Sequence, residues 1–130
     1  MVRFSSPGEF VTHIFTKKNY TTDNTFGFAE SFLCGGTDFE TPLREAAALI
    51  ENEGFENADL IFITDGACRI GNEFADGFHD KRTQLKFKVA GIVIGINAGS
   101  SLESFCEKMY CLDMTAGDSV ASDIITSFTC

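Results

Sequence analysis

The sequence predicts an α/β fold with a mostly parallel central sheet flanked by helices. Two observations support this prediction. Segments with strand-like and helix-like patterns alternate along the chain, which is typical of parallel α/β sheets. The continuous apolar run Leu60–Ile63 resembles a strand that is covered on both faces, and residues 87–96 resemble another buried strand. A chain of 130 residues is expected to form one domain, spanning residues 1–130.

The N-terminal part is expected to contain two short strands and a helix. Residues 2–5 and 11–16 have the composition of strands, and the second segment alternates apolar and polar residues. Residues 25–33 are expected to form a short helix, followed by the loop "CGGTD" at positions 34–38.

The next helix has clear local signals. Thr41 is expected to cap it, Pro42 suits its first position and Gly54 suits its end. Its buried face is expected to consist of four apolar residues with helical spacing, Leu43, Ala46, Ala47 and Ile50. The strand at Leu60–Ile63 then ends at Asp65 and Gly66.

The second half continues the alternation. A helix is expected over residues 73–85, and the strand over 87–96 follows it. Ser100 and Glu103 form a capping-box pattern, which predicts a third helix with the buried face Leu102, Phe105, Cys106 and Met109. A last strand over 110–114 and a helix capped by Asp118 complete the predicted order, the helix burying Ala121, Ile124, Ile125 and Phe128.

Composition narrows the classes of function. The net charge of −9 argues against nucleic acid as a ligand, because phosphate binding requires a basic face. No apolar run reaches the length of a membrane span and the N-terminus lacks a signal-peptide pattern, so we expect a cytoplasmic protein without membrane partners. The five cysteines contain no C-x-x-C pair, which favours free thiols over a disulfide framework or a zinc site.

The loop at 34–38 and the end of the strand at Asp65 are the candidate site. Ligands of open α/β sheets bind outside the carboxyl ends of the strands, and Asp65 lies at such an end. The chain contains no P-loop, no dinucleotide-binding glycine pattern and no G-x-S-x-G. Thr37, Asp38 and Asp65 offer oxygen ligands of the kind that Mg²⁺ prefers, and Gly35 and Gly36 allow close backbone approach. The alternative is a plain turn in which Asp38 accepts hydrogen bonds from nearby amides.

The segment "GGTDFETPL", followed by a helix and then "ADLIFITDG", resembles the von Willebrand factor A (VWA) domain. It is most similar to the bacterial intracellular branch with CoxE-like and ViaA-like members, and the resemblance spans residues 2–114. It implies a Rossmann-like fold with a metal-ion-dependent adhesion site that holds Mg²⁺ or Mn²⁺. By motif match, Thr37 and Asp65 are metal ligands, directly or through water, while Gly35, Gly36, Asp38 and Gly66 support the site loops.

The chain departs from this family in one respect. It contains no D-x-S-x-S motif, and it begins where the second strand of the family would begin. The first strand and helix of the family are therefore missing, and we expect weak or absent Mg²⁺ binding. A truncated reading frame is the favoured explanation; the alternative is that a partner chain or an exchanged segment of a second copy fills the open centre of the sheet.

The resemblance implies a non-catalytic protein-interaction module. In it a partner protein supplies a carboxylate to the metal, and related bacterial modules work as adaptors beside a MoxR-type AAA+ ATPase. Self-association through the open sheet is a further expectation. The alternatives are a metal-assisted hydrolase or phosphoryl-transfer enzyme that uses Asp65 and Thr37, and an inert truncated remnant.

Overall fold

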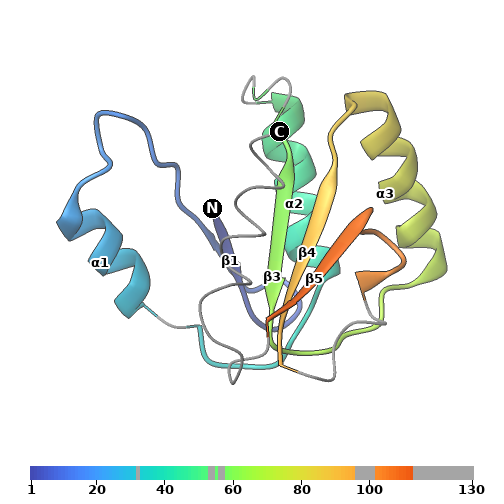
Figure 1. Ribbon diagram of the computed structural model, residues 1–130, viewed down its shortest axis with the longest axis horizontal. Helices are drawn as coiled ribbons and strands as arrows, with labels where there is room; N and C mark the ends of the chain where they lie inside the picture. The colour runs from blue at the N-terminus through green and yellow to red at the C-terminus, as the bar shows by residue number, and fades with distance from the viewer. Residues whose placement is uncertain (32, 53–54, 56–57, 96–101, 113–130) are drawn as a thin grey trace.

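The strands in the described part of the chain form two separate sheets (Figure 1). The computed structural model describes residues 1–31, 33–52, 55, 58–95 and 102–112. Three parallel strands, β3 (Leu60–Thr64), β4 (Val89–Ile94) and β5 (Lys108–Leu112), lie in the order β3-β4-β5. The strands β1 (Val2–Phe4) and β2 (Phe10–Thr12) form an antiparallel hairpin. The α/β class predicted from the sequence is thereby confirmed.

Two helices cover one face of the three-stranded sheet. They are α2 (Glu40–Asn52) and α3 (Asn72–Leu85), and both contribute to the buried core. Alternate strand residues point to opposite faces, so Phe62, Val89 and Val93 meet these helices together. The largest members of the core are aromatic or branched: Phe39, Leu43, Phe62, Phe78, Phe87, Val89, Leu102 and Phe105. Within the described residues, no helix is long and apolar enough to cross a membrane.

The opposite face of the sheet is less well covered than the sequence predicts. Ile61 and Ile63 project from β3 away from α2 and α3, and they remain 46% and 51% exposed. The prediction that this strand is covered on both faces is therefore wrong for β3. The apolar run indicates a buried strand correctly at β4, where five consecutive residues from Val89 to Val93 are buried.

The predicted helix with the face Leu102 to Met109 is wrong at its C-terminal end, because Met109 lies in β5. Leu102 and Phe105 are buried as expected, and the amides of Phe105 and Cys106 both donate to the Leu102 carbonyl in a helical turn. The Glu107 amide then donates to the Val89 carbonyl at 2.9 Å, and β5 begins at Lys108. Residues from Lys108 onward therefore pair with β4 as a strand and do not continue the helix. Gly54, Ser100 and the predicted helix after Asp118 lie outside the described residues.

The N-terminal elements differ from the prediction mainly in their bounds. The predicted strand over 11–16 is only Phe10–Thr12, and the predicted helix over 25–33 is α1 (Thr22–Glu30). This helix starts earlier because the Thr21 hydroxyl accepts a hydrogen bond from the Asn24 amide and so caps it.

Arg3 of the hairpin contacts helix α1 through Phe28 and Ser31, and His13 and Phe15 also pack against Phe28. None of the α1 residues is buried, and the helix stands apart from the central sheet (Figure 1). The Arg3 guanidinium lies 5.0 Å from the centre of the Phe28 ring, and it donates to the Phe28 carbonyl at 3.2 Å and to Ser31. His13 packs edge-on against the same ring at 5.1 Å.

We expect Arg3→Ala to loosen α1 without disturbing the sheet. Losing one cation–π contact and its hydrogen bonds should destabilise the docked helix by about 1–2 kcal/mol. Hydrogen exchange should then be faster at the α1 amides and unchanged in β3, β4 and β5. Arg69→Ala, at an exposed loop arginine, is the matched control. Equal protection of α1 in both variants would show that Arg3 does not anchor it.

Candidate functional site at the carboxyl rim of the sheet

Thr37 lies against Gly66, the residue that follows Asp65, at the rim where the parallel strands end. The loop that precedes α2 runs along this rim (Figure 1). The Thr37 hydroxyl oxygen lies 3.0 Å from the position that a Cβ atom on Gly66 would occupy. Asp65 is the adjacent residue, directly after β3, and both Asp65 and Thr37 are exposed to solvent. Two segments that are 28 positions apart, Thr37 and Asp65, thus form one surface.

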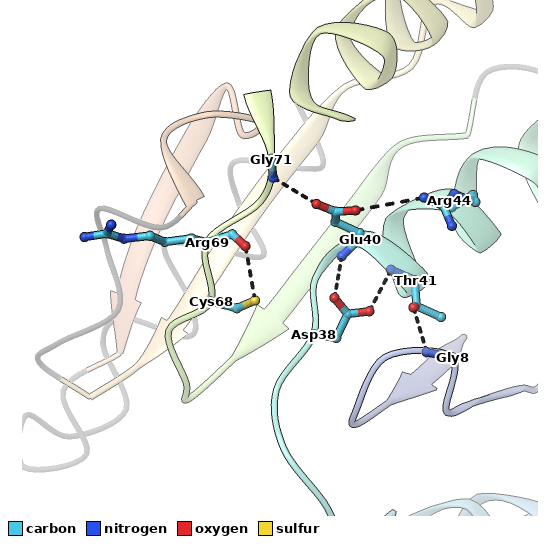
Figure 2. Close-up of polar contacts among 8 residues, drawn as sticks. All are labelled: Gly8, Asp38, Glu40, Thr41, Arg44, Cys68, Arg69 and Gly71. Atoms are coloured by element: carbon cyan, nitrogen blue, oxygen red, sulfur yellow. Dashed lines mark hydrogen bonds and ion pairs between the residues drawn. The ribbon is translucent and has the colours of Figure 1, made fainter. Parts of the chain in front are cut away.

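Asp38 caps α2. It is only 9% exposed, and its two carboxylate oxygens accept hydrogen bonds from the amides of Glu40 and Thr41 at 3.3 and 3.0 Å (Figure 2). This arrangement satisfies amides at the first turn, which have no partner within the helix. The prediction that Thr41 caps the helix is wrong. The Thr41 hydroxyl instead accepts a hydrogen bond from the Gly8 amide at 3.0 Å, because Asp38 lies nearer the free amides.

Gly35 and Gly36 bind the rim loop to the end of β1. The Gly36 amide donates to the Ser6 hydroxyl at 2.9 Å, and the Asp38 amide donates to the Ser5 carbonyl at 2.8 Å. A Cβ atom on Gly35 would collide with the hydroxyl oxygens of Ser5 and Ser6, so only glycine fits there. These serines are not among the site residues predicted from the sequence. The available signal was the turn-forming pattern "SSPG" directly after a strand.

Glu40 joins the start of α2 to the loop that leads into α3. Its carboxylate accepts a hydrogen bond from the Gly71 amide at 2.8 Å and lies 4.0 Å from the Arg44 guanidinium (Figure 2). The turn at Gly66 is closed independently, because its amide donates to the Thr64 hydroxyl at 3.1 Å. Hydrogen bonds from backbone amides therefore hold both rim loops, residues 34–38 and residues 65–66, near the point where Thr37 approaches Gly66.

The exposed oxygens of the rim fit a hard cation only in part. The Thr37 hydroxyl and the Asp65 carboxylate are donors that Mg²⁺ and Mn²⁺ accept. The carboxylate of Asp38 is already bonded to two amides, and the Ser6 hydroxyl is bonded to Gly36. Among the described residues, no group of three or more histidine, cysteine, aspartate or glutamate side chains is arranged to hold a metal ion. The described residues of this rim therefore offer two free side-chain oxygen ligands, Thr37 and Asp65, fewer than a hexacoordinate ion requires.

Burial makes Cys106 an unreactive thiol. Desolvation raises its pKa to about 12, and the nearby Arg82 guanidinium opposes this only partly. Cys34 in the rim loop and Cys111 in β5 are exposed.

The raised pKa of Cys106 gives a pH dependence of stability. The thiol keeps its proton in the folded protein while the unfolded chain loses it above its ordinary pKa of about 9. The protonated Cys106 thiol therefore contributes to the free energy of unfolding below pH 9, and this contribution is lost as the pH rises towards 12. Urea unfolding at pH 8 and pH 10.5 should therefore show a larger loss of stability for the wild type than for Cys106→Ala. An identical loss in both proteins would contradict this role.

The comparisons with known proteins give two relatives from one archaeon. The chain is similar to the protein MJ0077 of Methanocaldococcus jannaschii, with 34% identity over 91 residues that cover 70% of this chain and 22% of the relative. It is also similar to MJ0811 of the same organism, with 28% identity over 93 residues that cover 71% of this chain and 21% of the relative. Both relatives carry the description "uncharacterized".

The chain spans about a fifth of the length of these relatives. No family model matches the chain, and no solved structure matches it.

Proposed function

We propose that the chain is part of a non-catalytic protein-interaction module whose binding surface is the rim formed by residues 34–38 and 65–66. In this proposal, the Thr37 hydroxyl and the Asp65 carboxylate hold part of the coordination sphere of Mg²⁺ or Mn²⁺. A carboxylate of a partner protein and groups outside this chain complete it. The bound ion would supply a positive charge that attracts the partner carboxylate.

One observation carries this proposal: the Thr37 hydroxyl lies against Gly66, next to Asp65, on an exposed rim. Neighbouring polar groups hold the loops, as Asp38 does at the start of α2. Thr37 and Asp65 are left facing solvent at the edge of the sheet where α/β proteins bind ligands. The similarity of both loops to a VWA domain supports the choice of metal and the Rossmann-like classification.

The proposed partner is a protein. The net charge of −9 disfavours binding to nucleic acid. An acidic protein also repels the carboxylate of a partner, and a bridging metal ion would offset that repulsion. The resemblance to CoxE-like and ViaA-like proteins makes a MoxR-type AAA+ ATPase the first partner to test in a cytoplasmic setting. This part of the proposal rests on family analogy.

Paramagnetic Mn²⁺ provides the test of the site. We expect millimolar Mn²⁺ to broaden the amide signals of Thr37, Asp65 and Gly66 before those of the rest of the chain. The effect should disappear in Asp65→Ala, because that change removes the only charged ligand of the pair. Asp76→Ala, at an exposed aspartate on α3, is the matched control for charge. Broadening that is the same in both variants would contradict the proposed site.

A further inference from the structure

The hairpin strand β1 and the sheet strand β3 are neighbours that do not pair. They lie side by side and run in the same direction (Figure 1), and the Phe4 ring of β1 stacks on the Phe62 ring of β3 with centroids 5.2 Å apart. Adjacent strands of one sheet lie about 4.8 Å apart and share a ladder of hydrogen bonds. In the described part of the chain, β1 bonds only to β2 and β3 bonds only to β4.

The free edge of β3 faces away from β4. The Leu60 amide donates to the Lys88 carbonyl at 2.8 Å, on the β4 side. Successive residues of a strand point their backbone groups to opposite edges, so Leu60, Phe62 and Thr64 are directed towards β4. The amides and carbonyls of Ile61 and Ile63 are therefore directed to the other edge.

The free edge of β1 is defined in the same way. The N-terminal ammonium of Met1 donates to the His13 carbonyl at 2.6 Å, the His13 amide donates to the Met1 carbonyl at 2.8 Å, and the Ser5 amide donates to the Glu9 carbonyl at 3.1 Å. Met1, Arg3 and Ser5 thus face β2, while Val2 and Phe4 face the opposite edge. None of Val2, Phe4, Ile61 or Ile63 has a backbone hydrogen bond across its free edge within the described structure.

We propose that the interval between β1 and β3 is a docking slot for one extended strand of polypeptide. The strand would pair with Val2 and Phe4 on one edge and with Ile61 and Ile63 on the other, joining the two sheets into one. A strand bonded on both edges gains a full set of backbone hydrogen bonds, which is the basis of binding by strand addition. The slot is flanked by this chain on both sides, so the folded edge of a second copy is a poor fit for it.

The side chains around the slot define the chemistry of the strand. Phe4 and Phe62 lie on the face that packs against Phe39 and the core, so the strand needs apolar residues there. Ile61 and Ile63, about half exposed, border the slot on the other face. Both faces therefore favour a strand with few charges, such as a Val- or Ile-rich segment. The net charge of −9 further disfavours acidic residues beside it.

We assign the strand to the additional chain that longer proteins of this kind carry. In both relatives, about four fifths of the length lies outside the segment that matches this chain. The proposal does not depend on the metal site, since the slot is lined by backbone groups of β1 and β3.

Overlapping peptides provide the test. Peptides of about 15 residues, longer than the usual strand of about 5 residues, would tile the M. jannaschii relative MJ0077 outside the matching segment. Each would be titrated into the complete chain while amide hydrogen exchange is followed. We expect at least one apolar peptide to slow the exchange of Val2, Phe4, Ile61 and Ile63 together by about tenfold or more. Absence of any such peptide, protection elsewhere only, or dimerisation through these same amides would overturn the proposal.

Ile63→Pro gives a second, independent readout. Proline removes the amide that faces the slot but leaves the bonds to β4, and proline is tolerated at edge positions of this kind. Peptide affinity should fall at least about tenfold, whereas Ile63→Val should retain it. Equal affinity of Ile63→Pro and Ile63→Val would overturn the proposal. If Ile63→Pro fails to fold, the hydrogen-exchange experiment on the wild-type chain with the peptides still tests the proposal.

Discussion

Replacing Phe39 with alanine is expected to lower the free energy of unfolding by about 3–5 kcal/mol. Phe39 is 0% exposed and lies between the rim loop and α2. Its ring contacts those of Phe4, Phe62 and Phe105 at centroid distances of 6.4, 5.0 and 6.1 Å. The truncation would leave a cavity where the hairpin, the sheet and the turn at Leu102 meet, and it would loosen the attachment of β1.

Urea unfolding of Phe39→Ala and wild type, followed by circular dichroism, measures this loss. Phe26→Ala is the matched control, because the Phe26 side chain on α1 is 61% exposed. The control should change the free energy of unfolding by no more than about 0.5 kcal/mol. A loss below about 1 kcal/mol for Phe39→Ala would contradict the assignment of Phe39 to the centre of the core.

The second large effect is expected for Asp38→Ala, with a loss of about 1–2 kcal/mol. Alanine cannot accept the hydrogen bonds that the Glu40 and Thr41 amides now donate to the Asp38 carboxylate. These amides would be left without a partner in a partly buried position, which adds to the cost of losing the cap. The start of α2 also carries the Glu40 contact to Gly71, so the loop before α3 should loosen as well.

Asp38→Asn separates capping from charge. Asparagine offers one acceptor oxygen where aspartate offers two, so this variant should keep one of the two hydrogen bonds and part of the stability that alanine loses. Chemical denaturation of the three proteins gives the comparison, and hydrogen exchange at Gly71 reports on the loop. Full wild-type stability in Asp38→Ala would show that α2 does not depend on this cap.

The sequence predicts the parallel strands better than the segments around them. The apolar run at β4 indicates a buried strand because β4 lies at the centre of the parallel sheet, whereas the run at β3 marks a strand whose second face is half exposed. The helical spacing from Leu102 to Met109 is a local signal, and it fails because the Glu107 amide bonds to Val89, a residue distant in sequence. Exposure of Ile61 and Ile63 depends on which faces the helices cover, which local patterns do not encode.

The candidate site could be located from the sequence but not assembled from it. The rule that ligands bind at the carboxyl ends of parallel strands places Asp65 on the rim, where Thr37 also lies. The role of Asp38 remained open between a metal-site residue and a turn, and its two amide partners identify it as a cap. The contact between Gly36 and Ser6 joins segments 30 residues apart and leaves no local pattern.

The central claim is that Thr37 and Asp65 form part of a cation site that this chain does not complete alone. Calorimetric titration of the chain with Mg²⁺ tests this claim most directly. In the described part of the chain, one exposed hydroxyl, one exposed carboxylate and no cluster of three acidic, histidine or cysteine side chains predict weak binding, with no saturation in the micromolar range. Micromolar affinity that disappears in Asp65→Ala would contradict the claim, because the chain would then hold a complete site.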